Sequence, residues 1–88
     1  MPRQKTKVVA VQHTFIAIAP FAWGRSANSI EEAVKNAKAN ICRSFLKKGR
    51  WPINVYDVEN FIAVDGMGRI GYKGAAPEKV HTSYITIR

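Results

Sequence analysis

The sequence predicts an α+β fold: a single small domain in which one amphipathic helix packs on one face of a mainly antiparallel sheet. The chain has 88 residues, which is enough for one hydrophobic core and too few for two domains. Its hydrophobic fraction of 47% is ordinary for a globular protein. One long stretch has helical periodicity, and alternating stretches precede and follow it. We therefore expect the element order β-α-β-β-β.

The beginning of the chain is basic and then alternating. Residues 1–6 are polar and predict a flexible basic arm, with the compact domain spanning residues 7–88. Alternation from residue 7 to Pro20 predicts the first strand. This stretch imitates a short signal peptide, but polar residues interrupt it, and it is too short and polar to span a membrane. We therefore expect a cytoplasmic protein that does not contact a membrane.

The clearest predicted element is a helix over residues 29–48. Ser29 followed by Glu32 is a capping-box pattern, and Gly49 is the expected C-terminal cap. Apolar residues at steps of three and four form one stripe, which consists of Ile30, Val34, Ala37, Ile41 and Phe45. We expect this stripe to pack on apolar residues of the sheet, namely Val9, Val11, Phe15, Ile62 and Val64.

The remaining elements are predicted from local patterns. Residues 20–27 predict a connection, and Trp23 and Trp51 are expected to seal the two ends of the helix. A change of apolar parity within residues 57–60 indicates a bulge or a turn in the strand that follows the helix. The Asp-Gly pair at residues 65–66 predicts a hairpin turn, with a return strand to residue 72. Residues 80–87 predict the last strand.

No motif in the chain points to catalysis. Cys42 is the single cysteine, so no intrachain disulfide can form, and we expect a reduced thiol packed along the helix. His13 and His81 have no ligand partners at metal-site spacing. The glycine pattern of residues 66–71 lacks the helix that a dinucleotide site requires. We therefore expect a protein that is not an enzyme and has neither metal nor cofactor.

The charge of the chain suggests its partner. Fourteen Lys and Arg against six Asp and Glu give a net charge of +8. Clustered cations bind phosphate, and a neighbouring indole offers a stacking surface for a base. The leading hypothesis is a small basic nucleic-acid-binding protein that contacts mainly the phosphate backbone of DNA or RNA. The predicted contact residues are Lys35, Lys38, Arg43, Lys47, Lys48, Arg50, Trp51, the arm residues Lys5 and Lys7, and Arg69 near the hairpin tip.

The same charge also fits an acidic protein surface. Residues 23–33, with Gly24 and Ser29, resemble the strand-end, glycine and capped-helix segment of HicB-type antitoxins. That resemblance implies an inhibitor that docks on a protein. The chain departs from that family because we expect no extra strands before the helix and no DNA-binding module after it. The alternative is thus a small protein-binding inhibitor or adaptor, such as an antitoxin or a phage-type anti-defence protein. An exposed strand edge at residues 80–88 or 7–15 would also allow a homodimer.

Overall fold

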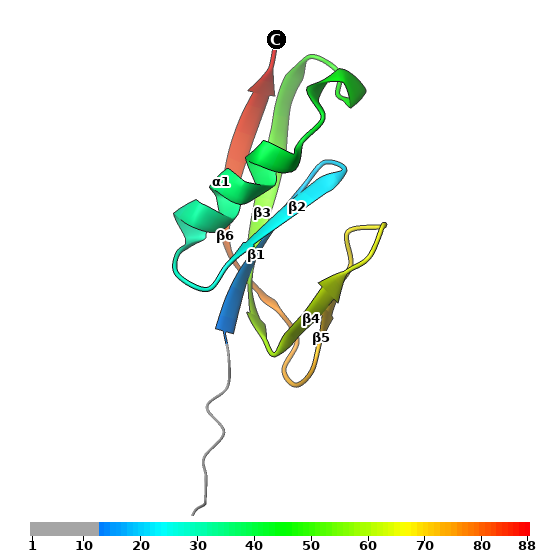
Figure 1. The fold of residues 1–88 in the computed structure, drawn as a ribbon. Coiled ribbons are helices and arrows are strands. Elements are labelled where there is room, and N and C mark those ends of the chain that lie inside the picture. The colour runs from blue at the N-terminus through cyan, green and yellow to red at the C-terminus, as the bar shows by residue number, and fades with distance from the viewer. Residues whose placement is uncertain (1–12) are drawn as a thin grey trace, which may run out of the picture.

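A four-stranded antiparallel sheet is the frame of the structure, a computed structural model that describes residues 13–88 (Figure 1). Across the sheet the strands lie in the order β2 (Ala22–Ser26), β1 (His13–Ala19), β3 (Gly49–Glu59) and β6 (Glu78–Ile87). The remaining elements are the helix α1 (Ile30–Asn40), the short 3-10 helix η2 (Arg43–Phe45) and the two-stranded hairpin of β4 (Phe61–Val64) and β5 (Ile70–Tyr72). The helix packs on one face of the sheet, and the predicted α+β class is confirmed.

Two strands precede the helix where the sequence predicts one. Residues 22–26 lack the alternation of apolar residues that predicts a strand, but a tight turn at Pro20 and Phe21 folds them back along β1. Phe21 adopts a φ of 58°, and Ala22 pairs with Ala19 directly after the turn. The predicted connection is therefore the strand β2. It also corrects the expectation that no extra strand lies before the helix.

The helix begins where its capping pattern predicts. The Ser29 hydroxyl accepts a hydrogen bond of 3.0 Å from the backbone N–H of Glu32. The Glu32 carboxylate accepts from the hydroxyl of Ser26 and the amide of Asn28. The Ser26 hydroxyl in turn accepts from the backbone N–H groups of Asn28 and Ser29. This buried serine therefore joins the end of β2 to the first turn of α1.

The helix ends at Asn40, eight residues before the predicted end at Lys48. Ile41 and the following residue are extended, so the helical phase is lost, and Leu46 rather than Phe45 reaches the core. Phe45 is 72% exposed, which corrects its predicted place in the stripe. Gly49 begins β3 instead of capping the helix. Cys42 is exposed between the two helices, contrary to its expected packing along one helix.

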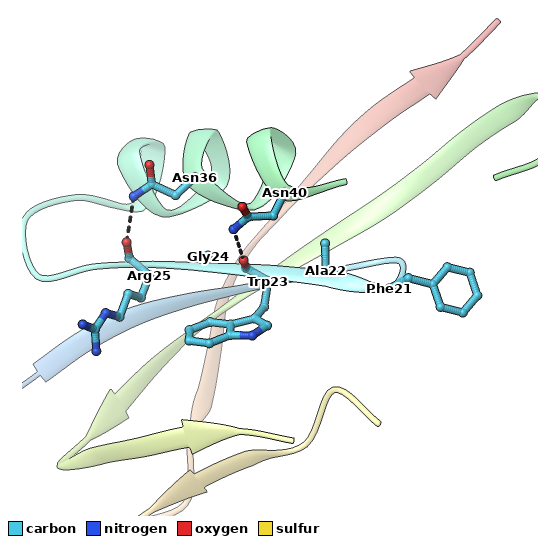
Figure 2. A pocket seen from close by; sticks show the side chains of 7 residues that line it. All are labelled: Phe21, Ala22, Trp23, Gly24, Arg25, Asn36 and Asn40. Atoms are coloured by element: carbon cyan, nitrogen blue, oxygen red, sulfur yellow. Dashed lines mark hydrogen bonds between the residues drawn. The ribbon is translucent and has the colours of Figure 1, made fainter. Parts of the chain in front are cut away.

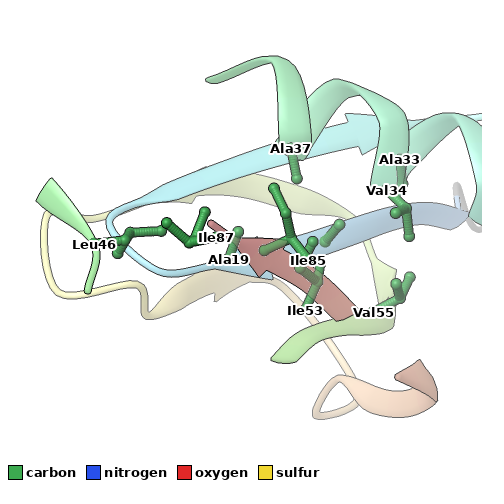
Figure 3. Close-up of a cluster of buried hydrophobic side chains, with 10 residues drawn as sticks. Ala19, Ala33, Val34, Ala37, Leu46, Ile53, Val55, Ile85 and Ile87 are labelled. Carbon is green, nitrogen blue, oxygen red and sulfur yellow. The ribbon is translucent and has the colours of Figure 1, made fainter. Parts of the chain in front are cut away.

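The main hydrophobic core lies between α1 and the sheet (Figure 3). Its buried members are Ala17, Ala19, Ala33, Val34, Ala37, Leu46, Ile53, Val55, Ile85 and Ile87. Phe15, Ile30 and Ile41 pack against this cluster as predicted, and Trp51 also packs against it. Ile62 is 67% exposed and Val64 lies outside the cluster, which corrects their predicted packing on the helix. Val9 and Val11 lie outside the described residues.

Ile62 is exposed because the chain turns at Asn60, within the stretch where the sequence predicts a bulge or a turn. Asn60 has a φ of 50°, a left-handed conformation that asparagine tolerates well. The turn separates β4 from β3, and among residues 13–88 the pairing partner of β4 is β5. The predicted hairpin turn is confirmed, since both the N–H of Met67 and the N–H of Arg69 donate to one oxygen of Asp65.

The β4–β5 hairpin covers part of the second face of the sheet, which α1 does not contact. The Trp23 ring lies 5.7 Å from the Phe61 ring on this face, and its side chain points away from the helix (Figure 2). Trp23 therefore does not seal an end of the helix. Ile16 and Val58 are fully buried on this side. The hairpin thus adds a small second core to the sheet.

The helix α1 packs directly against the backbone of β2 at Gly24. A Cβ atom at this position would lie 2.2 Å from the backbone nitrogen of Ala37 and 2.8 Å from the carbonyl oxygen of Ala33. Only glycine, which has no Cβ atom, leaves room for the helix backbone at this position. On the same helix, the amides of Asn36 and Asn40 donate to the carbonyls of Arg25 and Trp23 at 2.9 and 2.8 Å (Figure 2).

The substitution Gly24→Ala is expected to lower the free energy of unfolding by about 2–3 kcal/mol, because backbone atoms of the helix must move away from the new methyl group. Gly66→Ala is the matched control, since a Cβ atom there meets nothing within 4 Å, and its effect should stay within about 0.5 kcal/mol. Urea unfolding of both variants measures the difference. Equal stabilities would show that α1 and β2 can separate without cost.

Candidate nucleic-acid interface

Five basic residues gather where β3 begins and β6 ends. Arg43 belongs to η2, Lys47 and Lys48 directly precede β3, and Arg50 lies on its second position. Arg88 follows β6 and reaches the same end, because Gly49 pairs with Ile87. We call Arg43, Lys47, Lys48, Arg50 and Arg88 the basic end.

A shallow hollow of about 560 Å³ opens at the basic end. Three cationic residues line it, Arg43, Lys48 and Arg88, together with Ser44 and Thr86. No acidic side chain is among its lining residues, and its apolar part comes from Leu46 and Ile87. Cationic side chains that gather in this way suit a phosphate group, which accepts several charge-assisted hydrogen bonds at once.

The face of the sheet opposite the helix carries an aromatic side chain next to this hollow. The guanidinium of Arg50 lies over the ring of Tyr84, 3.8 Å from the ring centroid. Tyr84 is 45% exposed, and Arg50 is exposed beside it. A stacked guanidinium loses little further freedom when it binds a phosphate, because the ring already holds it in place. The pair therefore presents a positive charge and a flat ring side by side.

Sequence reasoning did not select Tyr84 or Arg88. The alternation of the last strand contains the signal for Tyr84: Ile85 and Ile87 face the core, so Tyr84 and Thr86 must face away from it. The position of Arg88 depends on the strand register, which the sequence pattern does not specify.

The other predicted contact residues lie elsewhere. Lys35 and Lys38 line a groove between α1 and β6, away from the basic end. The Trp51 indole is half-buried against the core, and its N–H donates to the Lys47 carbonyl at 2.9 Å. Arg69 forms an ion pair of 2.9 Å with Asp65 at the hairpin tip. The arm of residues 1–6, with Lys5, and Lys7 after it lie outside the described residues.

The acidic side chains lie away from the basic end. Asp57 and Glu78 pair across β3 and β6 at the opposite end of these strands, close to Glu59. Asp57 lies about 23 Å along β3 from Arg50 at about 3.3 Å per residue. This separation exceeds the Debye length of about 8 Å at physiological salt, so these carboxylates do not offset the basic charge.

Two further carboxylates are held by local hydrogen bonds. The Ser26 hydroxyl and the Asn28 amide hold the pKa of Glu32 below its ordinary value. The backbone N–H of Arg69, with smaller contributions from the Met67 N–H and the Arg69 side chain, lowers the pKa of Asp65. Both side chains are therefore ionised at neutral pH and serve the helix start and the hairpin turn.

Comparison of the chain with protein-family models, curated proteins and solved structures finds no match. Over residues 13–88, no helix is long and apolar enough to cross a membrane. In the same part of the chain, no three side chains of His, Cys, Asp or Glu come together as a metal site would need. The charge and the surface shape of the protein are therefore the features that indicate its function.

The pair of His13 and Asp57 predicts that stability depends on pH. It lies at the end of β3 that is opposite the basic end. The Nδ1 atom of His13 lies 2.8 Å from the Asp57 carboxylate, and this hydrogen bond and charge raise the pKa of His13 above 6.5. A raised pKa in the folded state stabilises the protein below pH 6.5, and this contribution is lost as the pH rises through the folded value. An NMR titration of the His13 ring should show the raised midpoint. In Asp57→Asn the midpoint should return toward 6.5, and an unchanged midpoint would contradict the assignment.

Proposed function

We propose that this protein binds nucleic acid through the basic end and contacts mainly phosphate groups, without catalysing a reaction. The observation that carries the proposal is the hollow at the basic end, which three cationic residues line and to which no acidic residue contributes. These groups come from η2, from the segment before β3 and from the end of β6. The fold therefore gathers cations that lie up to 45 positions apart in the sequence, from Arg43 to Arg88.

The charge distribution supports the same proposal. The net charge of +8 attracts a polyanion over long range. Close contact then depends on local geometry, because the basic end combines the hollow with the neighbouring pair of Arg50 and Tyr84. A phosphate in the hollow would place the adjacent nucleotide near the Tyr84 ring. This arrangement favours a single strand, whose bases are free to stack.

The double substitution Arg43→Ala/Lys48→Ala is expected to weaken nucleic-acid binding at least tenfold at moderate salt. It removes two of about four phosphate contacts, so the slope of log K against log salt should become less steep by about 1.4–1.8. Fluorescence polarisation with labelled single- and double-stranded DNA and RNA, at about 50 and about 300 mM salt, measures both quantities.

The matched control is Lys35→Ala/Lys38→Ala, which lowers the net charge by the same amount on a different surface. Its affinity should stay within about threefold of the unchanged protein, apart from a small general effect of charge. If the two double variants weaken binding equally, the attraction is that of net charge alone. The basic end would then have no special role.

Tyr84→Ala separates stacking from charge. Because base stacking on an aromatic ring contributes about 1–3 kcal/mol, this variant should lose about fivefold or more in affinity for single strands. Duplex binding should change by less than about twofold, since duplex bases are already stacked. An equal loss for both forms would mean that Tyr84 acts by holding Arg50. Unchanged binding of both forms would remove the ring from the interface.

A further inference from the structure

The two outer edges of the sheet differ. At β2, the amides of Asn36 and Asn40 occupy the carbonyls of Arg25 and Trp23 (Figure 2). At β6, none of the described residues pairs along the outer side of the strand. Its regular part, residues 81–87, has no proline and no bulge. Natural sheets usually protect such an edge, so an unpaired strand of this length is a surface for another chain.

The register identifies the groups that β6 presents outward. Trp23 pairs with Ile18, Ile18 with Asn54, and Asn54 with Thr82. Because the Trp23 carbonyl points away from β1, the alternation of antiparallel ladders directs the N–H and C=O groups of Thr82 away from β3. The same holds for Tyr84, which lies opposite Pro52, a residue without an N–H.

A groove of about 410 Å³ runs between α1 and the same strand. Ile30 and Val34 supply its apolar part, and His81 and Ser83 line it from β6. Lys35 and Lys38 are exposed along it, with Glu31 as the only acidic lining residue. The side chains of His81 and Ser83 enter this groove while the neighbouring Thr82 backbone points outward. A strand added to β6 would therefore place every second side chain in the groove.

We propose that the outer edge of β6 and the groove beside it bind an extended acidic segment of a partner protein. The segment adds antiparallel to β6 as a fifth strand of the sheet, and its acidic side chains meet Lys35 and Lys38 in the groove. Main-chain hydrogen bonds supply affinity and the groove supplies specificity. This surface is separate from the basic end and does not depend on nucleic-acid binding.

Charge favours an acidic partner over a second copy of this chain. Pairing of β6 with a second β6 would bring together two chains of net charge +8. The residues of β6 that line the groove, His81 and Ser83, are not acidic. Two cations, Lys35 and Lys38, would then share the single acidic lining residue Glu31. An acidic segment would both form main-chain hydrogen bonds with the edge of β6 and place carboxylates beside the two lysines.

The test uses a labelled peptide of alternating glutamate and valine, as long as β6, with blocked ends. In an antiparallel addition, residues whose side chains enter the groove direct their N–H groups away from β6, and their neighbours direct theirs toward it. With glutamate in the groove, N-methylation of the valines should weaken binding at least tenfold. N-methylation of the glutamates should change it by less than about threefold. These measurements use the unsubstituted protein, so folding of a variant does not enter.

The second arm is Lys35→Glu/Lys38→Glu, which should weaken peptide binding at least tenfold. The control is Arg43→Glu/Lys48→Glu, which makes the same change of net charge at the basic end. It should change the affinity for the peptide by less than about threefold. Circular dichroism checks that both variants keep their helix. Equal losses in the two double variants, or equal effects of the two N-methylated peptides, would overturn the proposal. So would peptide binding weaker than about 1 mM, or a homodimer of the free protein that buries the β6 edge.

Discussion

The approach of α1 to β2 at Gly24 fixes the arrangement of the rest of the structure. The helix can lie this close because glycine and two alanines, Ala33 and Ala37, form the contact. The helix therefore sits over β2 and β1. On β3 and β6, the core consists mainly of larger side chains of the strands themselves, such as Ile53 and Ile85. The space between α1 and β6 is a consequence of this offset. A helix centred on the sheet would fill it.

The separation of charge depends on the same frame. The long strands β3 and β6 pair over most of their length, so they carry the groups at their two ends far apart. One end collects the cations of η2 and of the chain around Lys48, and the other collects Asp57, Glu59 and Glu78. A small protein with few carboxylates can in this way present a strongly positive surface, while its acidic groups serve local structure instead.

Local signals predicted the elements that depend on local chemistry. The cap at Ser29 and the turn at Asp65 were predicted because their side chains bond to the nearby backbone. The strand β2 was missed because its pairing comes from the turn at Phe21 and from contact with the helix. The helix was predicted too long because the apolar spacing continues to Phe45, although the chain leaves the helical conformation at Ile41.

The candidate site was predictable to a similar extent. Arg43, Lys48 and Arg50 are close in the sequence and stay together in the fold. Lys35 was separated from them because the helix ends before η2. Arg88 joins them only through the register of β6 with β3, a long-range feature that residue spacing does not contain.

The amides of Asn36 and Asn40 have a consequence for how this sheet can grow. They occupy carbonyl groups on the β2 edge, so a further strand cannot use those groups. Open-ended stacking of sheets into a fibril needs two edges that accept a strand, one on each side of every copy. A sheet with a single accepting edge stops after one addition. Two asparagines on a helix therefore allow this protein to keep one long unpaired edge strand while limiting growth of the sheet to a single added strand.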